Sequence, residues 1–450
     1  MSASGGRGDP QPILTNLLQL PTVFTPMASS NSSLFLPLSF SLLFLLSNLS
    51  LANTSPISFA LPLIKDDATL QYFTTLSYGT PLVPTNFVLD LGGSFLWLHC
   101  ASRNIPSSSL ATVFLRSIQC LTAKSPEIET QTWFLNPADQ DQSCQIPIEN
   151  SVTGKRVTEG ELVQDLVALQ STQGSKGNKV ETLFACSPNL LLNGLASGAG
   201  GMLGLGRSRT SFSSQVFHSL TPQRKITLCL SSSSGVVLFG NTGYESQPAS
   251  EILRSLTFTP LVTDQDQTFP SINVNSIKIN GKKVSFNTPS LSQKGNGGTQ
   301  LSTVVPYTTL QSSIYANFES AYLKAASSMN MTRVSPVAPF GLCFRSGGLG
   351  SSQVGPNVPV IDLVLQSEMV KWSIYGRNSM VRVSDEVMCL GFLDGGLNPT
   401  NPIVIGGYQL EDVLLQFDFD TSMVGFSSSI LKKKTSCSDF KSGFMPAQSV

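Results

Sequence analysis

Few residues in this 450-residue chain have a type and spacing that point to chemistry. The clearest is Asp90, a single carboxylate within the segment VLDLGG at 88–93, where it could act as a general acid or base. No GxSxG segment precedes a helix, so a serine hydrolase has no nucleophile. His99 and His218 are the two histidines, and neither has a partner at metal-ligand spacing. We therefore expect no metal and no cofactor.

The segments around Asp90 have the length and composition of β-strands. Short alternating or apolar runs bounded by turn residues recur along the chain, including LQYFTTLSYG, SFLWLHC, ELVQDLVAL, KITLCL, GVVLFG and SIKING. Helical periodicity is clearest at 312–327. The apolar face of this predicted helix consists of Ile314, Phe318, Ala321, Tyr322 and Ala325. These patterns predict a mostly β fold.

A faint internal repeat indicates how the strands are organised. In the first half, VLDLGGSFLWL at 88–98 is followed later by GGMLGLGRS at 200–208. In the second half, QLSTVVPYTTL at 300–310 is followed at a similar distance by PIVIGGYQLED at 402–412. Two similar β lobes are the economical explanation. We expect a first lobe at 53–245 and a second lobe at 246–450.

The beginning of the chain reads as a leader. The apolar run LFLPLSFSLLFLL at 34–46 is too short for a lasting membrane span and is typical of a signal peptide. Ser50 and Ala52 are small residues that suit a cleavage site directly after them. Residues 1–52 are thus predicted to be an extension and a signal peptide. The initiator is either Met1 or Met27.

Composition agrees with a secreted globular protein. Lys+Arg 28 balance Asp+Glu 28, which argues against a partner that is a nucleic acid or a membrane surface. Eight cysteines without a CxxC pair favour disulfides over a metal site. The sequon Asn330-Met331-Thr332 is a predicted glycosylation site.

The order of these motifs resembles that of the pepsin-like aspartic proteases. Each of the two β lobes in that family carries a hydrophobic-hydrophobic-Asp-Thr/Ser-Gly loop, followed later by a hydrophobic-hydrophobic-Gly segment. Here 88–93, with Trp97 just downstream, stands at the first loop, while VIGG at 404–407 and the segment 417–426 match the closing motif. The resemblance covers nearly all of the chain after the leader and implies a bilobal pepsin-like fold.

The resemblance also makes the departures informative. Such proteases hold two carboxylates around one water, one ionised and the other protonated. Ser302 stands where the second aspartate belongs, and a serine cannot share a proton with Asp90. Leu91 replaces a hydroxyl residue that bonds between the loops, Val304 replaces a glycine, and the hairpin expected near 150–162 lacks the family's tyrosine. The resemblance therefore implies a protein that is not an enzyme, with a vestigial Asp90.

A narrower resemblance rests on longer segments. FACSPNLLLNGLASGAGGMLGLGRSRTSFSSQ, VPVIDLVLQSEMVKW and IGGYQLEDVLLQFD are similar to the plant extracellular dermal glycoprotein and basic 7S globulin group. That group includes inhibitors of fungal xylanases and of xyloglucan-specific endoglucanases. The resemblance implies a plant-defence inhibitor of microbial glycoside hydrolases that is secreted to the apoplast or cell wall. The oligomeric state stays open.

The group's pattern also implies a disulfide arrangement. It pairs Cys343 with Cys389 inside the second lobe and Cys229 with Cys437 between the lobes. Cys100 with Cys186 and Cys120 with Cys144 are the pairs then left. Sequence alone does not fix these pairs, because eight cysteines allow about 105 pairings.

A basic run at 432–434 is the candidate inhibitory loop. In the cereal xylanase inhibitors of this group, a histidine near the corresponding position enters the target's active site between two carboxylates. Lys433 occupies that place here, and its ammonium is suited to an acidic glycosidase cleft. The competing interpretation is a solvated basic surface. The segments 345–357, 394–402 and 432–436 are the candidate contact loops.

Two other functions remain open. The globulin branch of the group allows a peptide- or carbohydrate-binding cell-wall or storage protein. The retained Asp90 allows a residual aspartic endopeptidase that recruits an acidic residue from elsewhere.

Overall fold

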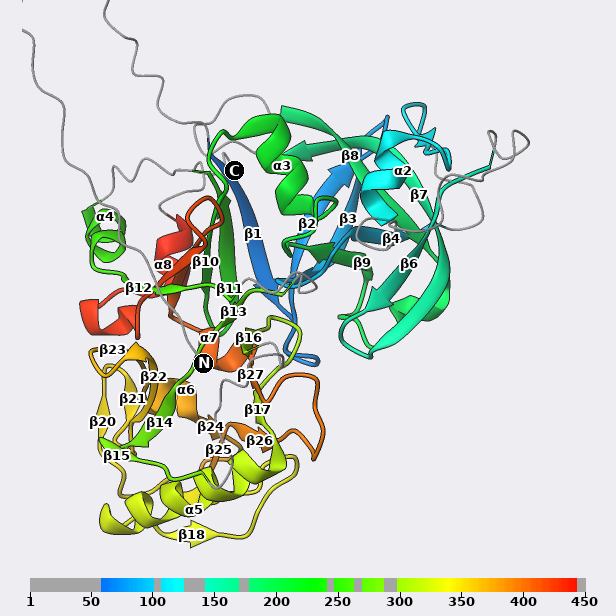
Figure 1. The fold of residues 1–450 in the computed structure, drawn as a ribbon. Coiled ribbons are helices and arrows are strands. Elements are labelled where there is room, and N and C mark those ends of the chain that lie inside the picture. The colour runs from blue at the N-terminus through cyan, green and yellow to red at the C-terminus, as the bar shows by residue number, and fades with distance from the viewer. Residues whose placement is uncertain are drawn as a thin grey trace, which may run out of the picture. The chain divides into compact units, whose positions relative to one another are not determined.

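The computed structural model describes residues 58–100, 107–124, 142–169, 178–240, 247–262, 269–286 and 298–442 (Figure 1). All of them belong to one compact unit, Ser55–Val450. The predicted extension, signal peptide and alternative initiators lie outside the described residues. The predicted boundary between lobes at 245 and 246 also lies outside them and stays a prediction.

The largest sheet gathers strands from both halves of the chain. Its strands are β1 (Phe59–Lys65), β2 (Tyr72–Tyr78), β3 (Val83–Asp90), β4 (Leu96–His99), β5 (Ala111–Thr112), β6 (Gln145–Asn150), β7 (Lys155–Leu169), β8 (Asn178–Ser187), β9 (Ala199–Gly204), β10 (Lys225–Leu230), β11 (Ser234–Phe239), β12 (Thr257–Pro260), β28 (Leu414–Asp418) and β29 (Met423–Phe426). Their order is β12-β29-β28-β10-β11-β1-β2-β3-β9-β4-β8-β7-β5, and β6 pairs with β7. The sheet therefore continues from the first half of the chain into the second.

Successive side chains of β1, β10 and β11 point to opposite faces of this sheet, and each face is covered by a different apolar cluster. In β1, Phe59 and Leu61 face the main apolar core, whereas Ala60 between them belongs to a second cluster. The second cluster includes Ile252 of α4 (Gln247–Arg254) and Phe440 of α8 (Cys437–Ser442). Strands buried on both faces read as nearly continuous apolar runs, as GVVLF of β11 does. In KITLCL of β10 the apolar run is interrupted by Lys225 at its start and by the buried Thr227.

Smaller sheets form most of the second half. Their strands are β13 (Ser271–Ile272), β14 (Ser276–Ile279), β15 (Lys282–Lys283), β16 (Thr299–Leu301), β17 (Thr308–Leu310), β18 (Arg333–Val334), β19 (Cys343–Arg345), β20 (Ser351–Ser352), β21 (Gly355–Pro356), β22 (Ile361–Ser367), β23 (Val370–Ile374), β24 (Met380–Arg382), β25 (Val387–Leu390), β26 (Phe392–Asp394) and β27 (Ile403–Ile405). The sheet that matters for the site has the order β13-β16-β27-β17-β26.

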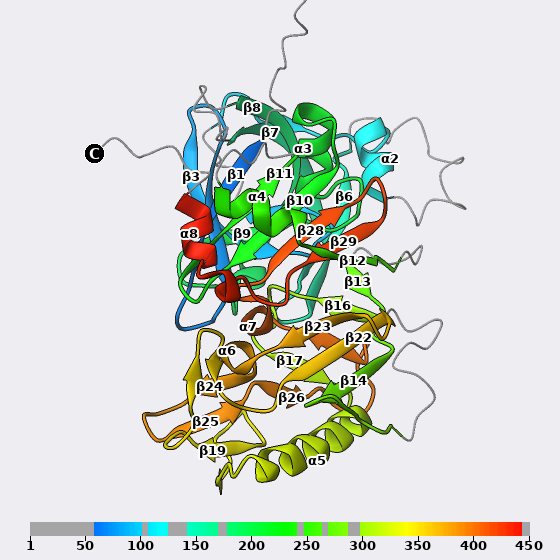
Figure 2. The same cartoon turned by 90° about the vertical axis from the view of Figure 1, so that its left-hand side faces the viewer.

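Helices are few and mostly short among the described residues. The remaining ones are α2 (Ile118–Lys124), η3 (Asn189–Leu192), α3 (Phe212–Leu220), α5 (Ser312–Ser328), α6 (Gly376–Ser379), α7 (Gly407–Leu410) and η4 (Ile430–Lys433). The long helix predicted at 312–327 is confirmed as α5, which lies beside β14 and β26 (Figure 2). Its fully buried residues are Ile314, Phe318, Tyr322 and Ala326. Ala321 and Ala325, also expected on this face, are partly buried and pack against the main core.

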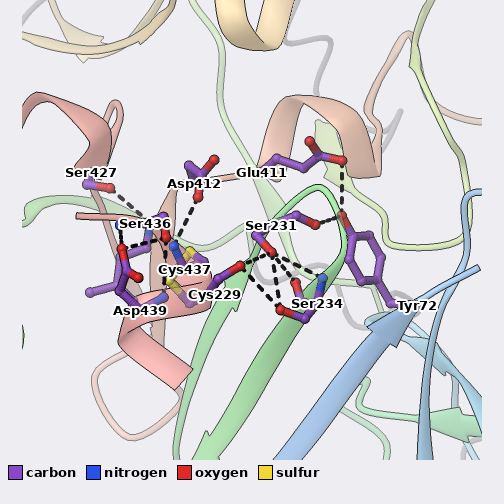
Figure 3. Close-up of a disulfide and its surroundings, with 12 residues drawn as sticks. Tyr72, Cys229, Ser231, Ser234, Glu411, Asp412, Ser427, Ser436, Cys437 and Asp439 are labelled. Atoms are coloured by element: carbon purple, nitrogen blue, oxygen red, sulfur yellow. Dashed lines mark hydrogen bonds between the residues drawn. A yellow bond between two sulfur atoms is a disulfide. The ribbon is translucent and has the colours of Figure 1, made fainter. Parts of the chain in front are cut away.

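Four disulfides join the two pairs that the resemblance implied and the two pairs expected for the remaining cysteines. They are Cys100–Cys186, Cys120–Cys144, Cys229–Cys437 and Cys343–Cys389. Cross-links of this kind stabilise a fold mainly by restricting the unfolded chain. Cys229–Cys437 ties α8 to β10 of the large sheet (Figure 3).

A buried polar network lies near that disulfide. The Tyr72 hydroxyl donates to the Ser231 carbonyl at 2.8 Å and to Glu411 Oε1 at 3.1 Å, as Figure 3 shows. Glu411 also forms a buried ion pair with Lys65 of β1. Burial, and then the charge of Glu411, raise the pKa of Tyr72. The network joins the first strands of the chain to the segment after α7.

Candidate functional site

Asp90 lies at the end of β3, where a parallel neighbour holds the backbone. β3 pairs in parallel with β9, with Asp90 opposite Gly204, and the Asp90 carbonyl accepts from the Leu205 N–H at 2.8 Å. The following turn brings the Gly92 N–H within 2.9 Å of Asp90 Oδ1. The second oxygen, Oδ2, accepts from the Ser151 hydroxyl. Both carboxylate oxygens are therefore in use.

The Asp90 carboxyl is almost completely enclosed, with 2% of the residue exposed. Burial raises the pKa of Asp90 above the usual range for an aspartic acid, because a charge is poorly solvated in such surroundings. Hydrogen bonds from Ser151 and from two backbone N–H groups act in the opposite direction. The net direction is upward, which favours the neutral acid more than in water.

The second loop has the same backbone arrangement. β16 pairs in parallel with β27, and the Ser302 N–H donates to the Ile405 carbonyl at 3.0 Å. Ser302 Oγ accepts from the N–H groups of Val304 at 3.3 Å and Val305 at 3.2 Å. Ser302 Oγ thus accepts hydrogen bonds from backbone N–H groups of its turn, as Asp90 Oδ1 does in the first turn. It adds no ionisable group.

A threonine hydroxyl joins the two loops. Thr303 Oγ1 donates to the Leu89 carbonyl at 2.7 Å and accepts from the Leu91 N–H at 3.1 Å. Leu91, the counterpart in the first loop, has no hydroxyl and packs into the main apolar core. One side of the link between the loops is therefore present, and it comes from the second half of the chain.

Apolar side chains fill the surroundings of both loops. Val304 is buried in a cluster with Trp97 and with Ile146 and Ile148 of β6. Gly92 has no room for a side chain, because a Cβ there would lie 1.8 Å from Phe269 Cδ1. Val304 is thus well packed where the resemblance expects glycine, and the ring of Phe269 lies directly against the first loop.

A hairpin occupies the place where the resemblance expects one. β6 and β7 pair in antiparallel fashion, and the turn between them carries Ser151. Asn150, at the end of β6, donates from Nδ2 to the carbonyls of Leu191 at 2.7 Å and Asn193 at 3.0 Å. The sequence reasoning missed Ser151. No local pattern marked it, because its partner Asp90 is distant in sequence.

The arrangement offers one carboxylate and no second one in the paired loop. Among the described residues, no group of three or more His, Cys, Asp or Glu side chains could hold a metal ion. In the same part of the chain, no helix is both long and apolar enough to cross a membrane. The two loops thus supply one buried carboxylate, that of Asp90, and one hydroxyl, that of Ser302.

The remaining predicted residues lie apart from these loops. Lys433 ends η4, and its Nζ lies 2.9 Å from Ser255 Oγ and 3.4 Å from Glu251 Oε1. Its neighbour Lys432 stacks on the ring of Tyr375, at 3.9 Å from the ring centre. Lys433 is therefore already paired within the chain. Its role as a contact residue stays a prediction.

The predicted glycosylation site follows α5. Asn330 is exposed and has a left-handed backbone with φ 58°. Its position is accessible to a modifying enzyme, and its modification stays a prediction.

Comparison with known proteins covers both halves of the chain. The family model described as xylanase inhibitor N-terminal matches residues 72–241, and the one described as xylanase inhibitor C-terminal matches residues 271–428. "Probable aspartic proteinase GIP2" from Nicotiana benthamiana is 44% identical over 80% of this chain and 86% of its own length. "Gamma conglutin 1" from Prunus dulcis is 39% identical over 79% of this chain and 83% of its own. The name of the first relative gives an activity, and the name of the second gives none.

Solved structures agree with the sequence comparison. The structure titled "Crystal structure of edgp" has a TM-score of 0.75 and 44% identity, covering 86% of this chain and 98% of that one. Basic 7S globulin from soybean has a TM-score of 0.73 and 31% identity, covering 85% of this chain and 99% of that one. The chain belongs to the xylanase-inhibitor-like family of pepsin-fold proteins, which also contains the basic 7S globulins and gamma conglutins.

Proposed function

We propose that this chain is a secreted, proteolytically inactive inhibitor of microbial glycoside hydrolases that acts in the plant cell wall space. A xyloglucan-specific endoglucanase or a xylanase is the proposed target. The observation that supports the proposal most is the match of both halves to xylanase-inhibitor families, combined with Ser302 in the position paired with Asp90. The second carboxylate that peptide hydrolysis needs is missing there.

Inhibition requires an anchor that fills the target's cleft. Lys433 is the proposed charged anchor, with an ammonium that faces the target's two carboxylates. Its present partner Glu251 is 75% exposed, and exposed ion pairs contribute only about 0–1 kcal/mol. A desolvated carboxylate of a target can therefore replace Glu251.

The second proposed anchor is apolar and belongs to the segment 394–402. Leu397 is 76% exposed, and its loop is held by hydrogen bonds. Its carbonyl accepts from Gln311 Nε2 at 3.0 Å, and the Gly395 N–H donates to the Leu310 carbonyl at 2.7 Å. A fixed loop presents an apolar side chain at little entropic cost.

The test is a titration of purified protein against a fungal xyloglucan-specific endoglucanase and a fungal xylanase at mildly acid pH. The proposal predicts stoichiometric loss of one of these activities. Lys433→Ala should raise the inhibition constant by about tenfold or more, since a buried charged contact is lost. Lys282→Ala, which removes an exposed lysine on the β14–β15 hairpin, is the matched control. Full activity of both glycosidases at excess protein would contradict the proposal.

The globulin and conglutin relatives favour a second candidate, a peptide- or carbohydrate-binding cell-wall or storage protein. Retention on immobilised peptide or glycan, without loss of either glycosidase activity, would support this candidate instead.

A further inference from the structure

The turn of the β6–β7 hairpin contacts the first loop directly. Ser151 Oγ donates to Asp90 Oδ2, while the other oxygen of Asp90 is taken by the Gly92 N–H. A ligand that reached Asp90 would therefore meet a buried carboxylate that already accepts a hydrogen bond on each oxygen. The Ser151 hydroxyl takes the place that a water or a ligand hydroxyl would otherwise occupy.

Asn150 fixes the turn from the other side. It is fully buried, and its Nδ2 donates to two carbonyls of the η3 region, those of Leu191 and Asn193. Its Oδ1 accepts from the N–H groups of Val152 at 2.9 Å and Thr153 at 3.2 Å. This local pattern fixes the turn conformation, so Ser151 reaches Asp90 without a further ordering cost.

The second half of the chain supports the base of the hairpin. Val304 packs in one apolar cluster with Ile146 and Ile148 of β6. Lifting the hairpin would draw Ile146 and Ile148 out of this cluster and expose them to water. Polar contacts at the tip and apolar contacts at the base therefore favour the same closed position.

We propose that Ser151 latches the β6–β7 hairpin shut over Asp90, an autoinhibitory contact that keeps peptide-like ligands away from the paired loops. The latch is independent of glycosidase inhibition, and its test does not use a glycosidase. It makes the surface of this protein, rather than the space between its loops, the place where partners bind.

Hydrogen exchange of the full chain, followed by mass spectrometry, tests the latch. In Ser151→Ala, amides of the segment 146–162 should exchange at least about tenfold faster, because a hydrogen bond to a carboxylate is lost. Amides of β28 should not change. Thr158→Ala, which removes an exposed hydroxyl from the same hairpin, is the matched control and should exchange as the wild type does.

A double-mutant cycle separates the latch from a general loosening of the turn. If Ser151 acts through Asp90, Ser151→Ala should change exchange by less than about twofold in an Asp90→Ala background. Unchanged exchange in Ser151→Ala, or an equal effect of Ser151→Ala in both backgrounds, would overturn the proposal.

Discussion

The loops that end β3 and β16 are built alike but carry different chemistry. In each, a strand with a parallel neighbour leads into a turn whose first side chain accepts a backbone N–H two residues on. Asp90 performs this task in one loop and Ser302 in the other. The serine hydroxyl satisfies the turn as the carboxylate does but cannot ionise at ordinary pH. Either side chain can thus fill the backbone role, whereas only the carboxylate can ionise.

The link between the loops is equally one-sided. The Thr303 hydroxyl forms hydrogen bonds to the backbone on both sides of Asp90. Leu91, at the equivalent position of the first loop, has no hydroxyl with which to form such bonds to the second loop. Burial of Leu91 and Val304 in apolar clusters accounts for their types. The two loops thus join the first half of the chain to the second through Thr303.

Thr303→Val should have the largest effect on stability. The substitution keeps the shape but leaves the Leu91 N–H and the Leu89 carbonyl buried without their partner, at a cost of about 3 kcal/mol of unfolding free energy. Urea unfolding would measure it, with the half-buried Thr309→Val on β17 as control. A loss no greater than that of the control would mean that Thr303 does not join the loops.

Val304→Gly should cost about 2 kcal/mol, since it removes buried methyl groups and adds backbone freedom to the unfolded chain. The variant restores the residue type that the resemblance expects. Thermal unfolding is the measurement. A rise in melting temperature would show that valine strains the loop instead of packing it.

Asp90→Asn should stabilise the protein at neutral pH by on the order of 1 kcal/mol. The folded pKa of Asp90 is raised, chiefly by burial and to a small extent by the charge of Glu149, so its contribution to stability is largest at low pH. That contribution is lost as pH rises through the folded pKa. Asparagine does not ionise, and the Ser151 hydroxyl can accept from its amide.

Unfolding of Asp90→Asn and of the wild type across a pH series would test this. The difference in stability should be small in acid and widen toward neutral pH. A gap that narrows with rising pH would mean that the Asp90 pKa is depressed.

Ser302→Ala should have the smallest effect, about 0.5–1 kcal/mol, because its two hydrogen bonds are long and both donors are backbone groups of the same turn. Chemical unfolding would measure the loss. A cost comparable to that of Thr303→Val would assign Ser302 a larger structural role than its contacts indicate.

Much of this architecture could be predicted from local pattern. The repeat of strand, loop and glycine segment predicted two equivalent loops, and the periodicity at 312–327 predicted α5. Contacts between distant residues could not be predicted in this way. Nothing in the sequence near Ser151 indicates Asp90, and nothing near Lys433 indicates Glu251, because tertiary packing alone brings these pairs together.

Peptide hydrolysis by a pepsin-like protein uses two carboxylates, and this pair of loops supplies one, that of Asp90. The most direct test is cleavage of a denatured protein substrate between about pH 3 and pH 5, by the wild type and by Asp90→Ala. We expect no cleavage by either protein. Cleavage by the wild type that Asp90→Ala abolishes would show that Asp90 is catalytic and that the protein is a protease.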